Sequence, residues 1–162
     1  MSWVTIPSPS QHCFGCGTDN PHGLKMEFET NGEQLRSSLT IPGHLRGWSN
    51  LAHGGVISTL LDEIMGWSGI HLLSSFLLTK DLKVRFKKPI FIGDQVIATG
   101  WVEQIMDDRH VILAGQLTNS DGDVLAKASG EFVLFSAEAF QKMGLVPAEE
   151  IHSMQSMFRE QR

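Results

Sequence analysis

Cysteine and positive charge are scarce in this sequence. Two of the 162 residues are Cys, which is too few for the disulfide framework of a small secreted protein. Lys and Arg total 13 against 18 Asp and Glu, so the formal net charge is −5. Because binding to phosphates requires a dense surface of Lys and Arg, nucleic acid is excluded as the main partner.

The first residues give no sign of a secretion signal. Residues 1–11 contain no basic region followed by an apolar core, so we expect a cytoplasmic protein. A length of 162 residues predicts one domain, which on folding buries about two-thirds of the surface of the unfolded chain.

The longest apolar segment, residues 56–78, is interrupted by charge. It is about as long as a membrane span, but it contains Asp62, Glu63 and His71. Since carboxylates are costly inside a bilayer, we expect a buried helix and no membrane partner. A helix this apolar has to be covered by a sheet, a partner chain or both.

Periodicity and turn residues predict an α+β fold with an antiparallel sheet, because strands run together and one long helix is segregated from them. We expect an irregular N-terminal arm over 1–22, a domain over 23–135 and a C-terminal helical extension over 136–162. The predicted strands are 23–30, 34–41, 78–88, 95–106, 110–119 and 124–135, and the predicted helices are 54–73, 137–144 and 148–162.

One face of the predicted long helix combines small residues with a carboxylate. At about 100° per residue, that face consists of Gly55, Ser58, Asp62, Gly66 and Gly69. Each Gly in a helix costs about 1 kcal/mol relative to Ala, so the glycines indicate a close approach by another group. Two interpretations stay open: tight packing against a strand, or an Asp62 that faces a cleft and acts as base or nucleophile.

The neighbouring carboxylate, Glu63, lies about 100° around the helix from Asp62. The two side chains therefore do not share a face, which disfavours the paired-carboxylate site of a glycosidase on this helix. We expect Glu63 to form a salt bridge or to contact water.

The helix start at His53-Gly54-Gly55 is a candidate oxyanion hole. The first N–H groups of a helix have no partner within it, and the helix dipole favours negative charge there. Gly54 has no side chain to block a carbonyl, whereas His53 is best interpreted as an N-terminal cap. Asp62 lies about 12 Å further along the axis, so a second chain supplying one end would complete the site.

Three segments of the sequence resemble a known family. They are residues 53–63 (HGGVISTLLDE), residues 84–94 (VRFKKPIFIGD) and residues 13–24 (CFGCGTDNPHGL). The first resembles the HGG…D motif of hotdog-fold acyl-CoA thioesterases, with the PaaI-like branch of the 4-hydroxybenzoyl-CoA thioesterase superfamily as the nearest group. The second is similar to the family's next strand and the third to the N-terminal segment of one bacterial branch. The resemblance covers about residues 12–135.

The resemblance implies a hotdog fold for residues 23–135, in which an antiparallel β-sheet wraps a long central helix. It implies a homodimer, with a dimer of dimers as a further possibility, and active sites at the dimer interface. The implied reaction is hydrolysis of an acyl-CoA thioester to a free acid and coenzyme A. Coenzyme A is then part of the substrate, so no separate cofactor and no metal are expected.

Position by position, the resemblance implies roles for several residues. Asp62 would be the general base or nucleophile of one protomer, and the Gly54 N–H of the other protomer would polarise the thioester carbonyl. Thr79 matches a Ser or Thr that orients the water in some members. Several members carry an Asn where this sequence has Gly47, and Asn50 is the candidate replacement. His53 completes the candidate catalytic set.

The candidate substrate-binding residues are Gly55, Arg85, Lys87 and Lys88. The last three belong to a basic stretch in an otherwise acidic protein. Two interpretations stay open for this stretch: the solvated face of a strand, or a contact with the phosphates of coenzyme A.

Cys13-x-x-Cys16, flanked by His12 and His22, allows three interpretations: a packed and reduced arm, a redox pair or a metal site. A structural zinc site uses four ligands at suitable spacings, and this sequence has one such Cys pair. The packed, reduced arm is therefore the favoured interpretation.

Two competing functions remain at the level of sequence. One is a non-catalytic module that binds acyl groups or acyl-CoA. The other is a hotdog enoyl-CoA hydratase or dehydratase, whose chemistry uses a His with a carboxylate; Pro42-Gly43-His44 has only a superficial likeness to that motif.

Overall fold

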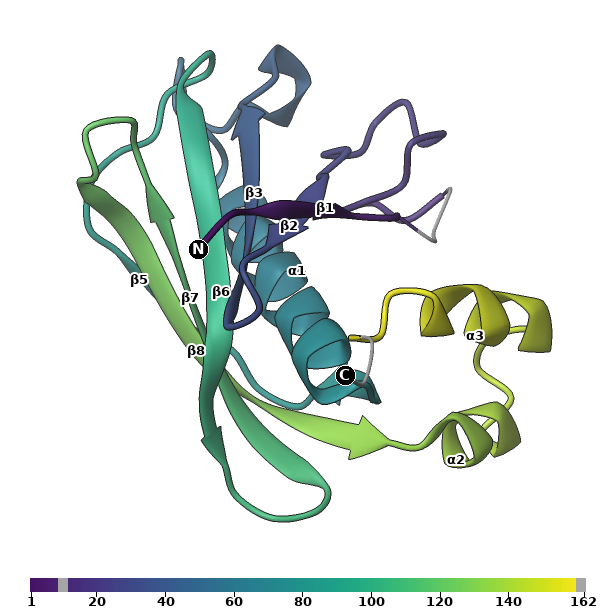
Figure 1. Cartoon of the computed structure of the whole chain (residues 1–162). Coiled ribbons are helices and arrows are strands. Elements are labelled where there is room, and N and C mark those ends of the chain that lie inside the picture. Colours follow the sequence, from purple (N-terminus) through teal and green to yellow (C-terminus); the bar gives the residue numbers. More distant parts are fainter. Residues whose placement is uncertain (9–11, 160–162) are drawn as a thin grey trace.

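The computed structural model describes residues 1–8 and 12–159. An antiparallel sheet curls around helix α1 (Gly54–Leu73), as Figure 1 shows. The strands are β1 (Val4–Ile6), β2 (Phe28–Thr30), β3 (Gln34–Thr40), β4 (Phe76–Thr79), β5 (Lys83–Phe86), β6 (Gln95–Ile105), β7 (His110–Thr118) and β8 (Val124–Phe135). Their order is β1-β2-β3-β6-β7-β8, and both β4 and β5 pair with β8. The predicted α+β class and the wrapped central helix are confirmed.

Helix α1 has the predicted bounds because both of its ends are marked in the sequence. His53 caps the first turn, where its Nδ1 accepts a hydrogen bond from the Gly55 N–H at 2.9 Å. Ser74 ends the helix with a left-handed backbone, φ 49°. The helix contributes four fully buried apolar side chains to the core: Leu60, Leu61, Ile64 and Met65. Each such side chain contributes about 1.5–3 kcal/mol by leaving water.

Two glycines in the middle of the sheet let α1 lie close to it. Gly100 of β6 pairs with Gly115 of β7. A Cβ atom at Gly100 would lie 2.7 Å from the carbonyl oxygen of Ile64, and one at Gly115 would lie 3.1 Å from Cγ of Met65. The backbone of the sheet therefore contacts the helix directly at this point.

The predicted strand over 78–88 is divided into β4 and β5. Thr79 pairs with Phe132, and Lys83 pairs with Ser129. The three residues 80–82 therefore lie opposite only two residues of β8, Gly130 and Glu131. The N–H groups of Lys80 and Asp81 both donate to the carbonyl oxygen of Glu131, at 2.9 and 3.3 Å. This extra residue is a β-bulge, which bends an edge strand.

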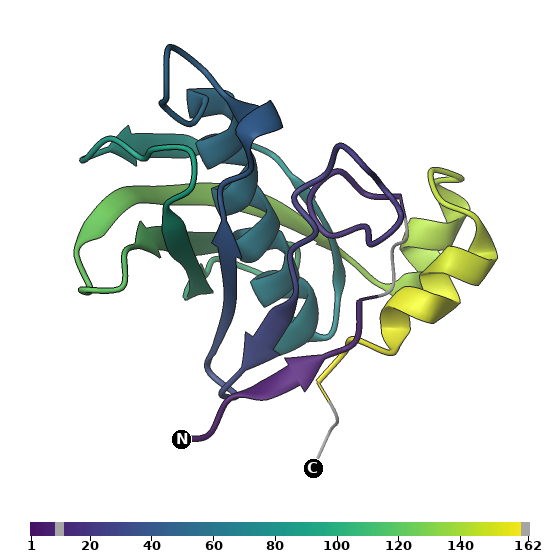
Figure 2. The same ribbon diagram turned by 90° about the horizontal axis from the view of Figure 1, so that it is seen from above.

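The prediction of an irregular arm over 1–22 is wrong at Val4–Ile6. These residues form β1, which pairs antiparallel with β2. The predicted strand over 23–30 is shortened to β2, because residues 12–27 form a loop beside α1 (Figure 2). Backbone hydrogen bonds from Leu24 to Phe14 (2.8 Å) and from Met26 to Gly15 (2.9 Å) hold this loop together.

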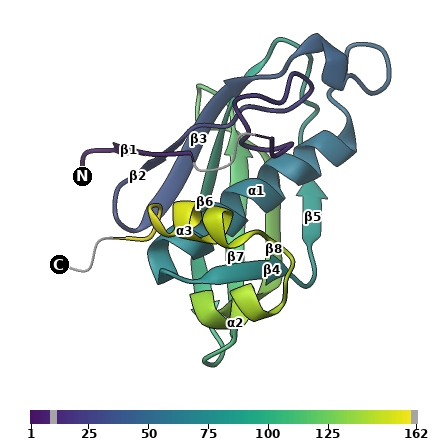
Figure 3. The same cartoon turned by 90° about the vertical axis from the view of Figure 1, so that its right-hand side faces the viewer.

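The C-terminal extension forms α2 (Ala137–Lys142) and α3 (Ala148–Gln155), both shorter than predicted; residues 160–162 lie outside the described residues. Figure 3 shows the two helices next to α1 and β4. Phe76 of β4 stacks on Phe140 of α2 at 5.0 Å between ring centroids. Within the residues that the structure describes, no helix is both long and apolar enough to span a membrane.

Candidate active site

Asp62 and Thr79 meet beside the middle of α1. The Thr79 hydroxyl donates a hydrogen bond to Oδ1 of Asp62 at 2.9 Å. Asp62 is half-buried on α1, and Thr79 is the exposed last residue of β4. The structure thus brings together the two residues that were expected to act on the attacking water.

Both side chains line a cavity of about 260 Å³. Trp67, Ile70 and Leu77 supply its apolar wall, and Val146 and Met154 close it from the C-terminal segment. This wall suits an apolar acyl group, since ligand cavities are mostly apolar with a few polar groups that fix orientation. Nothing in the periodicity of residues 136–162 indicates that they reach this cavity.

The helix start forms a second, separate cavity of about 360 Å³. Gly54 lines it together with Phe86, Lys87 and Lys88. Among the described residues, none accepts a hydrogen bond from the Gly54 N–H. This donor is therefore available to a ligand, and the Phe86 ring lies 3.7 Å from where a Cβ of Gly54 would be.

His53 and Gly55 are engaged with each other. The Gly55 N–H donates to Nδ1 of His53 at 2.9 Å, which requires that ring nitrogen to be unprotonated. The interpretation of His53 as a helix cap is confirmed. The same bond occupies the Gly55 N–H, so Gly54 provides the open donor at this helix start.

The loop before α1 explains why Gly stands at position 47. A Cβ atom at Gly47 would lie 3.1 Å from Cα of His53, so an Asn here would require the backbone to shift. Asn50 is exposed in the same loop, and its carbonyl oxygen accepts a hydrogen bond from the Ile92 N–H at 2.8 Å. Asn50 remains a candidate for polarising the thioester carbonyl.

The basic residues proposed to bind the substrate lie in two different cavities. Phe86 of β5 faces the start of α1, so Arg85 points to the opposite face of the sheet. There it lines a cavity of about 350 Å³ with Lys83 and Lys127. Lys87 and Lys88 remain beside Gly54. The structure therefore separates Arg85 from the other candidate substrate-binding residues.

Glu63 behaves differently from the prediction of a salt bridge or a water contact. Its Oε1 accepts hydrogen bonds from Nε1 of Trp67 at 2.9 Å and from Sγ of Cys13 at 3.5 Å. Burial, reinforced by the charge of Cys13, raises the pKa of Glu63 to about 7. The carboxyl group therefore belongs to a cluster with the N-terminal loop.

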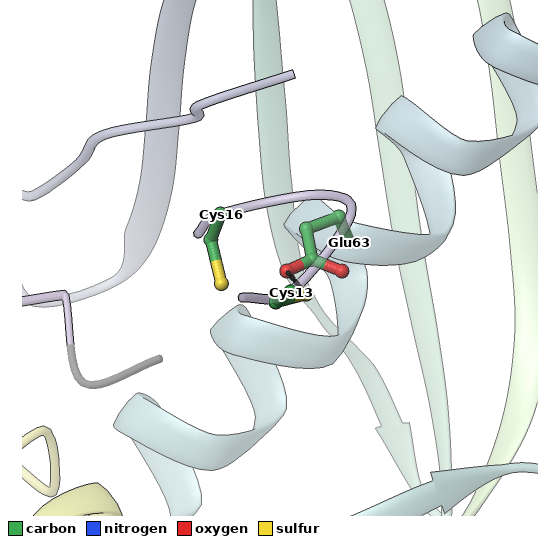
Figure 4. Close-up of side chains that lie close together, drawn as sticks. All are labelled: Cys13, Cys16 and Glu63. Carbon is green, nitrogen blue, oxygen red and sulfur yellow. Dashed lines mark hydrogen bonds between the residues drawn. The ribbon is translucent and has the colours of Figure 1, made fainter. Parts of the chain in front are cut away.

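Figure 4 shows that Cys13 and Cys16 lie close to Glu63, where the loop meets α1. Both cysteines are free, and Cys16 is 1% exposed. Hydrogen bonds lower the pKa of Cys13 to about 5, the largest contribution coming from the Cys16 thiol. The pKa of Cys16 is raised, because its proton is held by Cys13 and because it is buried. The potential ligand atoms of these three residues lie within 4.8 Å of one another.

Known protein sequences match the part of the chain that contains these candidate residues. A family model described as Thioesterase superfamily matches residues 49–125, which include Gly54, Asp62 and Thr79. The chain is 32% identical over 99 residues to acyl-coenzyme A thioesterase THEM4 of Xenopus laevis. That match covers 60% of this chain and 44% of THEM4, so the chain spans less than half the length of this relative.

Solved structures show the same fold. A thioesterase superfamily protein is 26% identical with a TM-score of 0.70, over 76% of this chain and 60% of that chain. A hypothetical thioesterase of Streptococcus pneumoniae, solved with coenzyme A, is 19% identical with a TM-score of 0.60, over 64% of this chain and 82% of that chain. The chain is thus similar to the thioesterase superfamily over residues 49–125, and it has the hotdog fold.

Proposed function

We propose that the protein hydrolyses the thioester of an acyl-CoA to a carboxylic acid and coenzyme A. The observation that carries this proposal is the 2.9 Å hydrogen bond between Thr79 and Asp62 at the wall of a partly apolar cavity. The match of residues 49–125 to the Thioesterase superfamily model supports it. The coenzyme A in the related S. pneumoniae structure supports a coenzyme A ester as the substrate.

Asp62 acts on the carbonyl carbon in one of two ways. It removes a proton from a water molecule that attacks the carbon, or it attacks directly and gives an anhydride that water then hydrolyses. Both routes pass through a tetrahedral oxyanion, which the Gly54 N–H stabilises. The carbon–sulfur bond then breaks, and a thiol pKa of about 8.5 makes coenzyme A a good leaving group. In the first route its thiolate takes up the proton that Asp62 removed from water; in the second it takes up a proton of the water that hydrolyses the anhydride.

Within a single chain, Asp62 and Gly54 are too far apart to act on the same carbonyl group. They lie in different cavities and about 12 Å apart along the axis of α1. Within the described residues, β4 and β5 pair only with β8. Their outer edge is therefore free to pair with another strand.

Pairing of this edge with its own copy about a two-fold axis would build a composite site. On this edge Thr79 is the last residue of β4, and Phe86 is the last residue of β5. Antiparallel pairing would bring Asp62 and Thr79 of one protomer next to the partner's Gly54. Phe86, which is 57% exposed, would then be covered. The functional unit is thus a homodimer with two equivalent sites.

Substitution of Asp62 tests the proposed reaction. We expect Asp62→Asn to slow thiol release from a panel of acyl-CoAs by about 10²- to 10⁴-fold, because it removes the base. Asp108→Asn, at an exposed turn, is the matched control and should hydrolyse at the wild-type rate. Equal rates for Asp62→Asn and the wild type would overturn the assignment.

The same panel separates the competing functions. Tight binding without thiol release by the wild type would identify a non-catalytic acyl-CoA binding module, which the replacement of the family's Asn by Gly47 leaves open. Loss of enoyl absorbance without thiol release would identify a hydratase.

A further inference from the structure

The cluster of Cys13, Cys16 and Glu63 plays no part in the proposed hydrolysis. Its members come from two segments, since Glu63 lies on α1 and the cysteines lie on the N-terminal loop (Figure 4). All three line the same cavity as Asp62. Two thiols and a carboxyl group in one partly buried cluster form a donor set that suits a borderline-soft divalent cation.

The distances fit a tetrahedral ion. Sγ of Cys13 lies 3.5 Å from Oε1 of Glu63. A sulfur at about 2.3 Å and an oxygen at about 2.0 Å from one tetrahedral zinc ion are about 3.5 Å apart. Sγ of Cys16 lies within 4.8 Å of the Cys13 sulfur and of a carboxylate oxygen of Glu63, so a small movement of one thiol completes the three-ligand set.

The loop presents its sulfur atoms in a tight turn. The Gly17 N–H donates to the carbonyl oxygen of Cys13 at 2.9 Å. A Cβ at Gly15 would lie 2.4 Å from the carboxyl carbon of Glu63. Only Gly therefore allows the carboxyl group to approach the turn this closely.

The carboxyl group is also held from its own helix. Nε1 of Trp67 donates to Oε1 of Glu63 at 2.9 Å. Such a hydrogen bond orients a metal ligand, and its loss typically lowers metal affinity about 10- to 100-fold. Trp67 is therefore placed as a positioning residue for the ligand.

We propose that Cys13, Cys16 and Glu63 bind one zinc ion, with a water molecule from the Asp62 cavity as the fourth ligand. Zinc is favoured because two thiolates and a carboxylate provide the S and O ligands that it accepts in tetrahedral geometry. The bound ion would join the N-terminal loop to α1 beside the proposed active site.

Metal content and cobalt spectra test this proposal directly. The full chain is purified under reducing conditions without chelator, and zinc is measured by mass spectrometry. We expect one zinc per chain in the wild type and none in Cys16→Ser. After exchange, Co²⁺ should give a sulfur-to-cobalt charge-transfer band and the visible bands of a tetrahedral ion. Trp67→Phe should weaken zinc binding about 10- to 100-fold.

Two variants provide matched controls. Glu150→Gln changes a carboxylate that lines the same cavity from α3, and Asp62→Asn removes the proposed base; both should retain one zinc per chain. Retention of zinc by Asp62→Asn separates this site from the proposed hydrolysis.

Three results would overturn the proposal. One is wild-type protein that takes up no metal from added zinc and shows no charge-transfer band with Co²⁺. Another is equal zinc content in the wild type and in Cys13→Ser/Cys16→Ser. The third is a disulfide between the two cysteines that persists under reducing conditions. The first measurement uses the wild type alone, so it stands even if the cysteine variants fold poorly.

Discussion

The hydrogen bond from Thr79 orients the Asp62 carboxylate in the proposed reaction. The hydroxyl donates to Oδ1 at 2.9 Å, and the other carboxylate oxygen is left to accept the proton of water. A hydrogen bond to a charged group contributes about 1.5–3 kcal/mol. Since about 1.4 kcal/mol corresponds to a factor of ten in rate, the loss of this bond should be measurable.

We expect Thr79→Ala to lower kcat about 10- to 100-fold with a smaller change in KM, because the substrate does not need this hydroxyl to bind. Thr79→Ser keeps the hydroxyl and should keep most of the activity. Steady-state hydrolysis of an acyl-CoA by both variants measures the effect. An Ala variant as fast as the wild type would show that Asp62 does not depend on Thr79.

The residues of the site differ in how far the sequence predicts them. Asp62 and Thr79 each stand at a fixed position in a recognisable motif, and the structure places them together. The contact between Glu63 and Cys13 joins residues 50 positions apart. The N-terminal loop has no hydrophobic period that would place it against α1. From the sequence, Glu63 is placed only by its angle around the helix, which does not reveal its contact with Cys13.

At the scale of elements, the close contact between α1 and the sheet depends on Gly100. A Cβ at this position would lie 2.7 Å from the carbonyl oxygen of Ile64 and 3.1 Å from its carbonyl carbon. These are backbone atoms, so a rotamer change cannot relieve the overlap. The helix and the strand would have to move apart.

We expect Gly100→Ala to lower the free energy of unfolding by about 1–3 kcal/mol, as overpacking of a core does. Gly66→Ala is the matched control, because its Cβ would lie 3.9 Å from Leu77 and Ala favours a helix by up to about 1 kcal/mol. Urea denaturation of both variants measures the difference. Equal stability of the two variants would contradict direct backbone contact at Gly100.

Local signals explain which elements the sequence predicts. The bounds of α1 follow from a capping His53 and from the end of the apolar pattern at Leu73. Apolar and charged residues alternate in the sequence directly after the bulge between β4 and β5, so the pattern predicts one strand over residues 78–88. β1 is only three residues long, and its pairing with β2 is a tertiary contact that periodicity does not reveal.

At the scale of the whole molecule, the C-terminal extension forms part of the wall of the Asp62 cavity. Phe140 packs on Phe76 of β4, and Met154 of α3 lines the Asp62 cavity. The helices themselves were predictable from Ser136 and Pro147, which precede their first turns. Their docking depends on aromatic contacts between segments far apart in the sequence. A hotdog domain over 23–135 alone would therefore lack one wall of the cavity.

The proposed dimer predicts that a charge on the free sheet edge removes both assembly and activity. Phe86→Glu would place a carboxylate where two copies of the edge pair, so we expect a monomer by light scattering and loss of thiol release. Ile105→Glu is the control, because Ile105 is 62% exposed at the far end of β6. It should remain dimeric and active. A dimeric Phe86→Glu variant would exclude pairing through this edge. An active wild-type monomer would exclude the composite site, because Asp62 would then work without the partner's Gly54.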